Sequence, residues 1–355
     1  MPDYRSDNPY QTLLAEALTS QGSTVQFPQG YRRVFPLWRA LKQSEIPFEV
    51  LHLHWINPYL KGKTFWVRLV YSIKFLIDVW LVKIAGIRII WTVHNLIAHE
   101  AQFPKLELWV QRQLVQQIDN VIVHQKTAHN TVVQLYGVAS KKVKVIPHGH
   151  YRTVYGPAID KSSARQQLGL SLQKKVYLNF GMLRPYKGIE TLLEVWREGQ
   201  LFLRQTTLLI AGKPKDTEYE QIIREMVTNI DTVILHLKYI EDRDIPLYFS
   251  AADVVVLPFN NLLTSGSLLL AMSYGKPIIA PRLSGIPETL ANAETLLYNP
   301  DENLGLLHSL KKSLELDLSV LEQQVTVACD KLSWVDIGKS TYQVYQSSNI
   351  LPTLP

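Results

Sequence analysis

The stretch Leu257–Ala280, LPFNNLLTSGSLLLAMSYGKPIIA, decides the fold together with Asn179–Trp196, NFGMLRPYKGIETLLEVW. Each stretch is typical of a buried strand that passes through a turn into a helix. One turn carries the cations Arg184 and Lys187, and the other carries hydroxyl groups at a helix start. A helix N-terminus attracts an anion, because its first N–H groups are unpaired and its dipole is positive there. Two such turns in one α/β domain predict that a diphosphate binds between them.

The two turns also supply the residue types that a phosphate site requires. Arginine binds phosphate through a planar fork, lysine binds it as a compact charge, and glycine lets a ligand approach the backbone. Simpler interpretations exist, since a lysine in a turn is usually solvated and one serine or threonine is enough to cap a helix. Three hydroxyls around one glycine exceed what a cap needs. The predicted phosphate contacts are Gly181, Arg184, Lys187, Thr264, Ser265, Gly266 and Ser267.

Short β-rich runs alternate with longer helical patterns along the chain, which predicts doubly wound parallel sheets. The pattern breaks in PHGHYRTVYGP, residues 147–157, and this places a domain boundary near residue 155. The first helix is expected to begin near Pro9, with a very short strand or none before it. The expected strands are Thr24–Phe27, Glu49–His54, Arg88–Val93, Asn120–His124 and Lys142–Ile146 in the first domain, and Val176–Phe180, Thr206–Ala211, Thr232–Leu237, Val254–Pro258, Pro277–Ala280 and Thr295–Tyr298 in the second.

Several motifs resemble the C-terminal half of a GT-B glycosyltransferase of the broad family-4-like group, the glycosyl transferases group 1. The resemblance is strong over about residues 170–345 and weaker before them. In the N-terminal half, TVHN at residues 92–95 and VIPHG at residues 145–149 fit the same group. The C-terminal motifs are the turn from Gly181 to Gly188, the AADV step at residues 251–254, Ala271-Met272 with Gly275 and Pro277, Gly285 with Pro287 and Glu288, and Ser333-Trp334 before the last helix.

The resemblance implies an α/β protein in which two Rossmann-like doubly wound domains face each other across a cleft. Residues 1–155 are then the acceptor-binding domain, residues 156–333 bind a nucleotide-diphosphate sugar, and residues 334–355 form a helix that crosses back to the first domain. The implied reaction moves a hexose from a UDP- or GDP-sugar to a saccharide or lipid-linked saccharide in cell-surface glycan or exopolysaccharide synthesis, with retention of configuration. No cofactor is expected besides this nucleotide-sugar co-substrate.

The resemblance also implies roles for individual residues. Arg184 and Lys187 stabilise the departing nucleoside diphosphate, and His94 contacts the donor sugar from the end of its strand. Tyr239 and Ile240 hold the nucleotide base through backbone groups and packing, which any residue type can provide. From residue type alone, a lone histidine such as His94 is more often structural than functional.

The sequence departs from the pattern of this group at the donor site. Two glutamates that usually stand eight positions apart fall on Leu262 and Leu270, and a basic residue that often follows the first glycine is Met182. Leucine accepts no hydrogen bond, so carboxylate contacts to ribose and sugar are missing. If the enzyme inverts, Glu100 is the best-placed carboxylate for a general base, although a solvated loop is the simpler interpretation. The leucines also keep open an alternative function, that of a catalytically silent GT-B protein acting as a membrane-associated partner in a glycan-assembly complex.

Composition and short motifs bear on four further properties, which are nucleic-acid binding, disulfides, metal binding and localisation. The chain has 37 Lys and Arg against 31 Asp and Glu, a net charge of +6, but no zinc spacing or recognition helix, so no nucleic-acid partner is expected. One cysteine, Cys329, allows no internal disulfide and fits a reducing compartment. No metal is predicted, because the acidic run EDRD at residues 241–244 is interpreted as a charged helix start and not as the Asp-x-Asp motif with which metal-dependent glycosyltransferases of the other major fold hold Mg²⁺ or Mn²⁺. Without a signal peptide or a run of about 18 uncharged apolar residues, we expect a cytoplasmic protein at the inner face of the cytoplasmic membrane.

The stretch Thr64–Gly86, TFWVRLVYSIKFLIDVWLVKIAG, predicts a long amphipathic helix. One half of its helical wheel is apolar and is expected to pack on the sheet. The other half carries the charged residues together with Phe75 and Val79. Aromatic side chains among cations suit an anionic membrane surface, toward which long basic side chains extend. Burial of both halves is the alternative.

Overall fold

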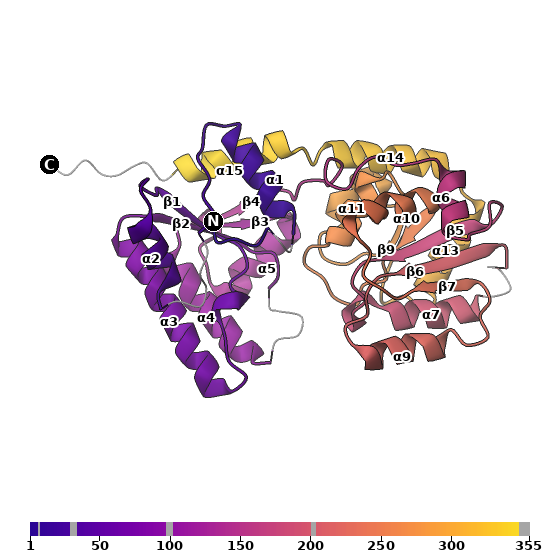
Figure 1. The fold of residues 1–355 in the computed structure, drawn as a ribbon, viewed down its shortest axis with the longest axis horizontal. Coiled ribbons are helices and arrows are strands. Elements are labelled where there is room, and N and C mark those ends of the chain that lie inside the picture. Colours follow the sequence, from indigo (N-terminus) through magenta and orange to yellow (C-terminus); the bar gives the residue numbers. More distant parts are fainter. Residues whose placement is uncertain (6–7, 29–33, 97–101, 200–203, 348–355) are drawn as a thin grey trace. The chain divides into compact units, whose positions relative to one another are not determined.

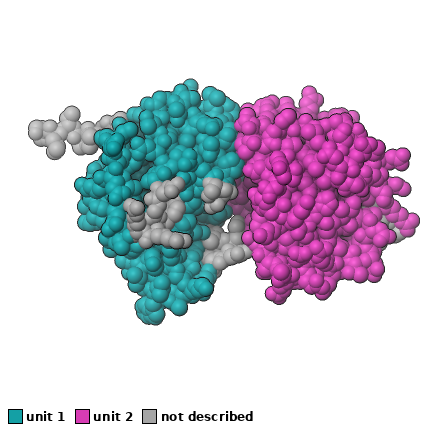
Figure 2. All heavy atoms as spheres, viewed as in Figure 1, with its two compact units in different colours: residues 1–149, 333–355 teal, residues 150–332 magenta. Residues whose placement is uncertain are grey.

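The computed structural model describes residues 1–5, 8–28, 34–96, 102–199 and 204–347. The chain forms two compact units, each with its own parallel sheet (Figures 1 and 2). Unit 1 comprises Met1–Gly149 and the chain from Ser333 onward, and unit 2 comprises His150–Leu332. The first division therefore falls after Gly149, where the sequence placed it near residue 155.

The sheet of unit 1 has four parallel strands in the order β1-β2-β3-β4. Helices α1 and α15 pack together on one face, and α3 and α4 pack together on the other (Figure 1). The strands are β1 (Val50–Leu53), β2 (Arg88–Thr92), β3 (Asn120–Val123) and β4 (Val143–Val145). The helices are α1 (Tyr10–Thr19), α2 (Pro36–Gln43), α3 (Phe65–Ile84), α4 (Pro104–Gln117), α5 (Lys126–Tyr136) and α15 (Trp334–Gln346), with 3-10 turns at Asn57–Tyr59 and Ser140–Lys142.

The last helix closes the core of unit 1 from a distant part of the sequence. A Cβ atom on Gly338 would lie 2.7 Å from the carbonyl oxygen of Ala17, so α15 and α1 touch closely at this glycine. Ile337 and Val344 of α15 join a buried cluster with Leu14 and with residues of the sheet. Residues 334–346 therefore belong structurally to the N-terminal sheet.

The predicted strand Thr24–Phe27 is wrong, because this segment makes no ladder with β1 or any other strand. Val25 and Phe27 are partly buried against the core of unit 1, and this packing accounts for their alternating pattern without strand pairing. The other ten predicted strands form, with ends that move by at most two residues.

The sheet of unit 2 has six parallel strands in the order β10-β9-β8-β5-β6-β7. The order reverses between β5 and β8, so the loops after these two strands diverge at a topological switch point, where ligands of open α/β sheets bind. The strands are β5 (Lys175–Phe180), β6 (Thr206–Ala211), β7 (Val233–His236), β8 (Val254–Val256), β9 (Ile278–Pro281) and β10 (Leu297–Tyr298). The helices are α6 (Lys161–Gln167), α7 (Ile189–Glu198), α9 (Thr217–Met226), α10 (Ile245–Ala251), α11 (Gly266–Ser273), α12 (Ile286–Leu290), α13 (Gly305–Glu315) and α14 (Leu318–Asp330), with 3-10 turns at Pro185–Lys187, Asp242–Asp244 and Ala291–Ala293.

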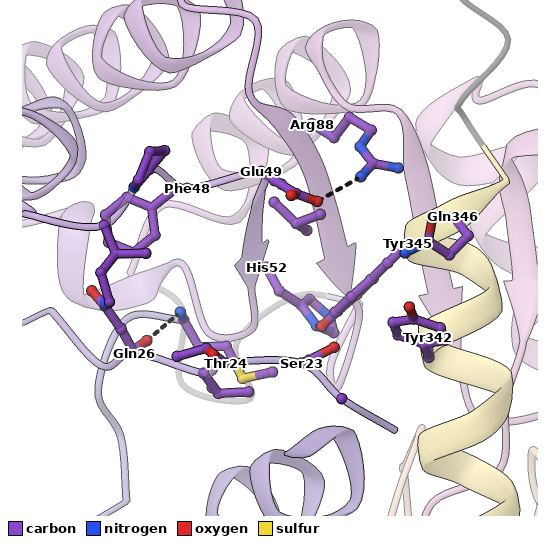
Figure 3. A pocket seen from close by; sticks show the side chains of 16 residues that line it. Ser23, Thr24, Gln26, Phe48, Glu49, His52, Arg88, Tyr342, Tyr345 and Gln346 are labelled. Atoms are coloured by element: carbon purple, nitrogen blue, oxygen red, sulfur yellow. Dashed lines mark hydrogen bonds and ion pairs between the residues drawn. The ribbon is translucent and has the colours of Figure 1, made fainter. Parts of the chain in front are cut away.

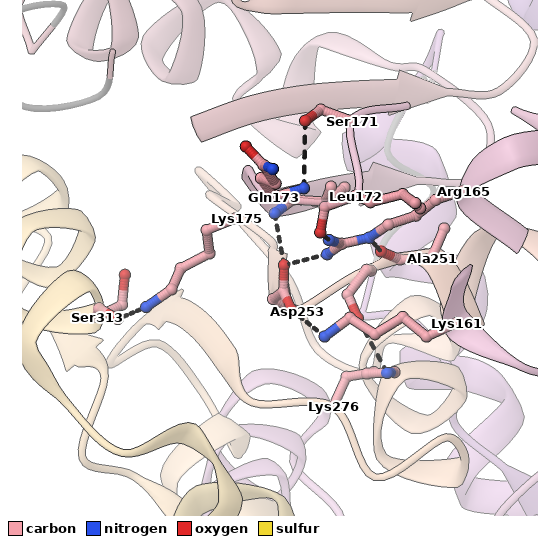
Figure 4. A network of polar contacts seen from close by, with 12 residues as sticks. Lys161, Arg165, Ser171, Leu172, Gln173, Lys175, Ala251, Asp253, Lys276 and Ser313 are labelled. Atoms are coloured by element: carbon pink, nitrogen blue, oxygen red, sulfur yellow. Dashed lines mark hydrogen bonds and ion pairs between the residues drawn. The ribbon is translucent and has the colours of Figure 1, made fainter. Parts of the chain in front are cut away.

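Asp253, the acid of the AADV motif, braces the amino end of this sheet (Figure 4). Its carboxylate accepts hydrogen bonds from the Arg165 guanidinium at 2.5 Å and from the Val176 N–H at 2.6 Å, and it also pairs with Lys161. Arg165 is buried, and a buried charge is tolerated only when it is paired. Asp253 thus neutralises Arg165 and joins β5 to the start of β8, away from the carboxyl ends of the strands.

Helix α3 forms where the sequence predicts it, but with the opposite face inward. Phe75 and Val79 of the charged half are buried, whereas Trp66 and Val70 of the apolar half are 73% and 65% exposed. The expectations that the apolar half packs on the sheet and that the charged half, with Phe75 and Val79, faces a membrane surface are therefore both wrong.

The reason is that the polar groups on the inward face of α3 find partners inside the unit. The Asp78 carboxylate accepts two hydrogen bonds of 2.9 Å from the N–H groups of Leu37 and Trp38 and so caps α2. Arg68 pairs with the buried Glu107 of α4 at 3.0 Å. No helix among the described residues is long and apolar enough to cross a membrane.

Candidate active site

The turn between β5 and α7 is built around two glycines with positive φ. Gly181 has a φ of +111°, and Gly188, the N-cap directly before α7, has a φ of +69°. A Cβ atom on Gly188 would lie 1.9 Å from the carbonyl oxygen of Pro258, and a Cβ atom on Gly212 would lie 1.8 Å from that of Gly181. Only glycine therefore lets the loops after β5, β6 and β8 approach one another this closely.

Helix α11 begins directly opposite this turn. The Ser265 hydroxyl accepts a hydrogen bond of 3.1 Å from the Leu268 N–H, so Ser265 is the N-cap. Ser267 is different, because the Lys187 ammonium donates to its hydroxyl oxygen at 3.4 Å. A Cβ atom on Gly181 would lie 3.0 Å from Lys187 Nζ and 3.2 Å from Ser267 Oγ. The structure thus brings Gly181, Lys187 and Ser267 together at the carboxyl edge of the sheet.

The electrostatics of this corner favour an anion. Burial and, to a smaller extent, the neighbouring positive charge of Arg184 together lower the pKa of Lys187 to about 8. Two cations and the N-terminus of α11 therefore meet where burial penalises positive charge. A phosphate placed here would stabilise the charged form of Lys187 and accept hydrogen bonds from it.

The other predicted donor-site residues lie nearby or on neighbouring strands. Gly266 is exposed at the first turn of α11, and a Cβ atom there would meet only the Tyr151 hydroxyl, at 3.9 Å. Thr264 is half-buried just before the cap. Tyr239 is exposed and Ile240 is buried, both after β7, at one edge of the sheet. Their contact with a nucleotide base stays a prediction.

The two leucines that replace the expected glutamates are both buried. Leu262 and Leu270 pack in the interior of unit 2, and the backbone oxygen of Leu262 accepts a hydrogen bond from Ser284. Their apolar side chains thus contribute to packing at positions where carboxylates would require polar partners. Glu100 lies outside the described residues.

In unit 1, His94 lies at the carboxyl end of β2 as the sequence predicts, but inside a cluster of histidines. Its Nε2 atom is 3.2 Å from Nδ1 of His54, and its Nδ1 atom is 3.4 Å from Nε2 of His124. Trp55 stacks on the ring at a centroid distance of 4.4 Å. Both ring nitrogens of His94 are therefore engaged within the protein, and a contact with a donor sugar requires one of them to exchange partners.

The hydrogen bonds fix the tautomers of His54, His94 and His124. His124 Nδ1 lies 2.9 Å from the carbonyl oxygen of Ile146, which only accepts, so His124 carries its proton on Nδ1 and its Nε2 accepts. His94 must then donate from Nδ1, and His54 must donate to His94 Nε2. The Nε2 atom of His54 remains as a buried acceptor that has no partner among the described residues.

Burial keeps these rings neutral. It lowers the pKa of His94 and His54 well below the ordinary value, with neighbouring histidines adding to the effect. Burial also lowers the pKa of His124 to about 4 and that of His148 to about 3. The cluster is therefore an uncharged array of hydrogen bonds at neutral pH.

His52, His54 and His124 are missing from the residues that the sequence singled out. The signal was present, because a histidine ends or closely follows each of the four strands of unit 1, in the runs VLHLH, TVH, VIVH and VIPH. The carboxyl ends of neighbouring parallel strands meet at one edge of a sheet, so this repetition predicts a cluster.

A separate cavity of about 410 Å³ lies beside β1 in unit 1 (Figure 3). Glu49 and Arg88, which pair at 3.8 Å, line it near the amino ends of β1 and β2, and Tyr345 of α15 lines its opposite side. Ligands of parallel sheets bind at the carboxyl ends, so this position does not suit the reacting groups. Within the described ranges, no three His, Cys, Asp or Glu side chains are grouped in a way that could hold a metal ion.

Comparison with known families assigns both units. The family described as glycosyl transferases group 1 matches residues 174–315, which include the turn with Lys187 and the N-terminus of α11. The family described as Glycosyltransferase Family 4 matches residues 14–150, which include the histidine cluster up to His148. The chain is a GT-B glycosyltransferase of the family-4 type. This confirms the resemblance and the two-domain α/β fold, and the enzyme is a nucleotide-sugar-dependent hexosyltransferase.

Individual relatives of the glycosyltransferase cover most of its length. A GDP-mannose:glycolipid 4-beta-D-mannosyltransferase from Xanthomonas campestris pv. campestris is 27% identical over 341 residues, covering 95% of this chain and 88% of the relative. A D-inositol 3-phosphate glycosyltransferase from Corynebacterium aurimucosum is 25% identical over 359 residues, covering 95% and 79%.

Solved structures share the fold at lower identity. HepE from Anabaena, in complex with UDP-glucose, matches with a TM-score of 0.71 at 18% identity, covering 97% of this chain and 90% of that chain. WaaG, a glycosyltransferase involved in lipopolysaccharide biosynthesis, matches with a TM-score of 0.67 at 13% identity and covers 95% of both chains.

Proposed function

We propose that unit 2 binds the diphosphate of a UDP- or GDP-sugar between the β5–α7 turn and the N-terminus of α11. The observation that carries this proposal is the convergence of Gly181, Lys187 and Ser267 at the edge where the strand order reverses. Lys187 Nζ lies 3.4 Å from Ser267 Oγ, and a Cβ atom on Gly181 would lie 3.0 Å and 3.2 Å from these two atoms. The glycine leaves room for a ligand beside the backbone, the lysine supplies charge, and the helix start supplies unpaired N–H groups.

In this proposal Arg184 and Lys187 stabilise the negative charge that grows on the diphosphate as the bond to the sugar breaks. Charged groups fixed in place before the reaction are worth more than mobile ones, because they need no reorganisation. Thr264, Gly266 and Ser267 bind phosphate or ribose oxygens, and Tyr239 and Ile240 bind the base. No metal is needed for this role of the two cations.

The acceptor in the proposal is a saccharide or a lipid-linked saccharide of cell-surface glycan or exopolysaccharide synthesis, bound by unit 1. The name of the Xanthomonas relative supports this, because it pairs GDP-mannose with a glycolipid acceptor. A lipid-linked acceptor places the enzyme at the inner face of the cytoplasmic membrane, in contact with its anionic surface.

Retention of configuration is the stereochemical outcome that the family-4 resemblance implies, and it remains part of the proposal. The beta linkage in the name of the Xanthomonas relative gives a specific reason to examine it. NMR of the anomeric proton in the first product formed, compared with the donor, decides between retention and inversion.

The donor site is tested by thermal unfolding with UDP, GDP, ADP and TDP, with CMP as a monophosphate control. A ligand at about 100 times its dissociation constant adds ~2.7 kcal/mol of stability. We expect UDP or GDP to raise the unfolding temperature of the unaltered protein and to do so much less in Lys187→Ala. No shift with any nucleoside diphosphate would contradict the donor site.

A further inference from the structure

Helix α3 presents a continuous apolar stripe to solvent. Its members are spaced alternately four and three residues apart, which aligns them along one side of an α-helix. Over the 20 residues of α3 the helix is roughly 30 Å long at about 1.5 Å per residue. The stripe consists of Trp66, Val70, Ile73, Ile77, Trp80 and Ile84, each between 42% and 73% exposed.

Further apolar side chains are exposed on α4 and at the start of α3. Trp109 of α4 is also exposed, and α4 packs beside α3 through the Arg68–Glu107 ion pair. Phe65 and Val67 are exposed at the first turn of α3. Scattered apolar side chains are ordinary on a protein surface, but a contiguous apolar patch of this extent marks an interaction site.

Two lysines, Lys74 and Lys83, flank the stripe, and Lys83 pairs with Asp119, which follows α4. The acidic side chains of α3 and α4 are Asp78 and Glu107, and both are buried with partners inside the unit. Lys74 directly follows Ile73 and Lys83 directly precedes Ile84, so the two lysines lie on opposite flanks of the stripe, about 100° around the helix from it. Lysine stems of this kind lie along apolar surface while the ammonium groups extend toward charged headgroups.

We propose that the α3 stripe docks on an anionic lipid bilayer, with the helix parallel to the membrane surface. Its aliphatic side chains would enter the boundary between headgroups and acyl chains, and Trp66 and Trp80 would lie at the headgroup level, where indole rings are favoured. Lys74 would contact anionic headgroups on one flank, whereas Lys83 on the other flank is held by its ion pair with Asp119. This inference rests on the proposed function, because docking on a bilayer serves the reaction when the acceptor is held in the membrane.

A second copy of the chain is the principal rival for the stripe, because the alternating spacing is also that of a coiled-coil seam. A seam between two copies needs complementary charges along its flanks. The flanks of α3 carry Lys74 and Lys83, of which Lys83 pairs with Asp119 in its own unit, and no acidic residue of α3 or α4 is exposed. Two such faces brought together place like charges side by side, whereas an anionic bilayer supplies the opposite charge. The charge pattern thus favours the bilayer.

The test compares two double substitutions in vesicle co-sedimentation. Val70→Glu with Ile77→Glu places two charges seven residues apart on the stripe, and Val320→Glu with Val327→Glu does the same on α14 of unit 2. Val320 and Val327 are both 51% exposed, so the control makes the same change in charge at similarly exposed helical positions. Vesicles contain equal amounts of phosphatidylcholine and phosphatidylglycerol, or phosphatidylcholine alone.

We expect the unaltered protein and the α14 control to sediment with phosphatidylglycerol vesicles and less with phosphatidylcholine alone. The α3 variant should bind at least ~10-fold more weakly, because apolar side chains leave the bilayer and two anionic groups face an anionic surface. Salt should weaken the binding of the unaltered protein, since the basic flanks act through screened charges. Quenching of tryptophan fluorescence by brominated phosphatidylglycerol, reduced in Trp66→Phe, provides the same test without adding charge.

Unchanged vesicle binding by a folded α3 variant, or quenching that Trp66→Phe leaves intact, would overturn the proposal. A dimer of the unaltered protein that the α3 variant loses, with no vesicle binding by either, would overturn it in favour of a second copy. Nucleoside diphosphate binding reports on unit 2 separately. If it fails while vesicle binding persists, the donor site is wrong and the docking surface stands.

Discussion

The carboxyl edges of the two parallel sheets carry opposite chemistry on the same kind of topology. In unit 1 the strands end in histidines, and His54, His94 and His124 are buried, neutral and bonded to one another. In unit 2 the corresponding edge has glycines with open backbone and the cations Arg184 and Lys187.

The comparison shows how one architecture separates two tasks. A neutral array of fixed tautomers cannot compensate an anion, but it can orient hydroxyl groups, since it holds donors and acceptors at defined atoms. A pair of cations beside helix N–H groups compensates a diphosphate but orients neutral groups poorly. The division supports the assignment of the donor phosphates to unit 2.

Acidification should have the largest effect of the changes considered, and it should destabilise unit 1 more than unit 2. The pKa values of His52, His124 and His148 are lowered by burial to about 3, 4 and 3, so below about pH 6.5 the unfolded chain binds protons that the folded unit does not. The free energy of unfolding of unit 1 therefore keeps its full value above about pH 6.5 and falls as the pH drops toward about 4. The loss is roughly 2 kcal/mol per histidine between about pH 7 and about pH 5.

Calorimetry between these pH values measures the effect, with unit 2 as the internal control. The histidines of unit 2 are all at least partly exposed. We therefore expect the transition that involves unit 1 to move to lower temperature much more than that of unit 2. Equal shifts of both transitions would show that the buried array does not govern the acid response.

Removal of either cation of unit 2 should reduce turnover. Lys187→Ala and Arg184→Ala are each expected to reduce turnover at least ~100-fold, because each deletes a fixed charge that stabilises the leaving diphosphate. Met182→Ala, an exposed residue of the same turn, serves as the control and should have little effect. Near-normal turnover in either cation variant would remove that residue from the donor site.

The smallest expected effects distinguish the roles of two serines at the start of α11. Ser265→Ala removes the N-cap and should cost about 1 kcal/mol of stability with little change in nucleotide affinity. Ser267→Ala should leave stability nearly unchanged but weaken nucleoside diphosphate binding several-fold, because its hydroxyl faces Lys187. Urea unfolding and calorimetric titration measure the two quantities, and the reverse pattern would exchange the two roles.

The fold and the two turns that meet in unit 2 could be predicted from the sequence because both depend on local signals. Gly181 and Gly188 mark positions where the backbone needs positive φ, and Ser265 marks a helix start. The turns can therefore be predicted without knowledge of distant residues. Their meeting follows from strand order, which the alternation of strands and helices indicates.

The orientation of α3 could not be predicted in this way. The buried face of α3 depends on Asp78 accepting hydrogen bonds from Leu37 and Trp38, and on Arg68 meeting Glu107, residues about forty positions away in the sequence. Helical periodicity ranks faces by hydrophobicity and contains no information on such partners. An apolar face left outside and a polar face paired inside therefore indicate a surface with its own task.

The contact between His52 and Tyr345 has a consequence for synthesis of the chain. The Tyr345 hydroxyl lies 2.6 Å from His52 Nδ1 in a fully buried position, and Ile337 and Val344 belong to the same core as Met1 and Tyr10. Unit 2 is continuous and leaves the ribosome whole, whereas unit 1 lacks part of its core until the last helix emerges. The N-terminal sheet is thus completed only after unit 2, and a truncation before α15 leaves the first-made unit unfinished.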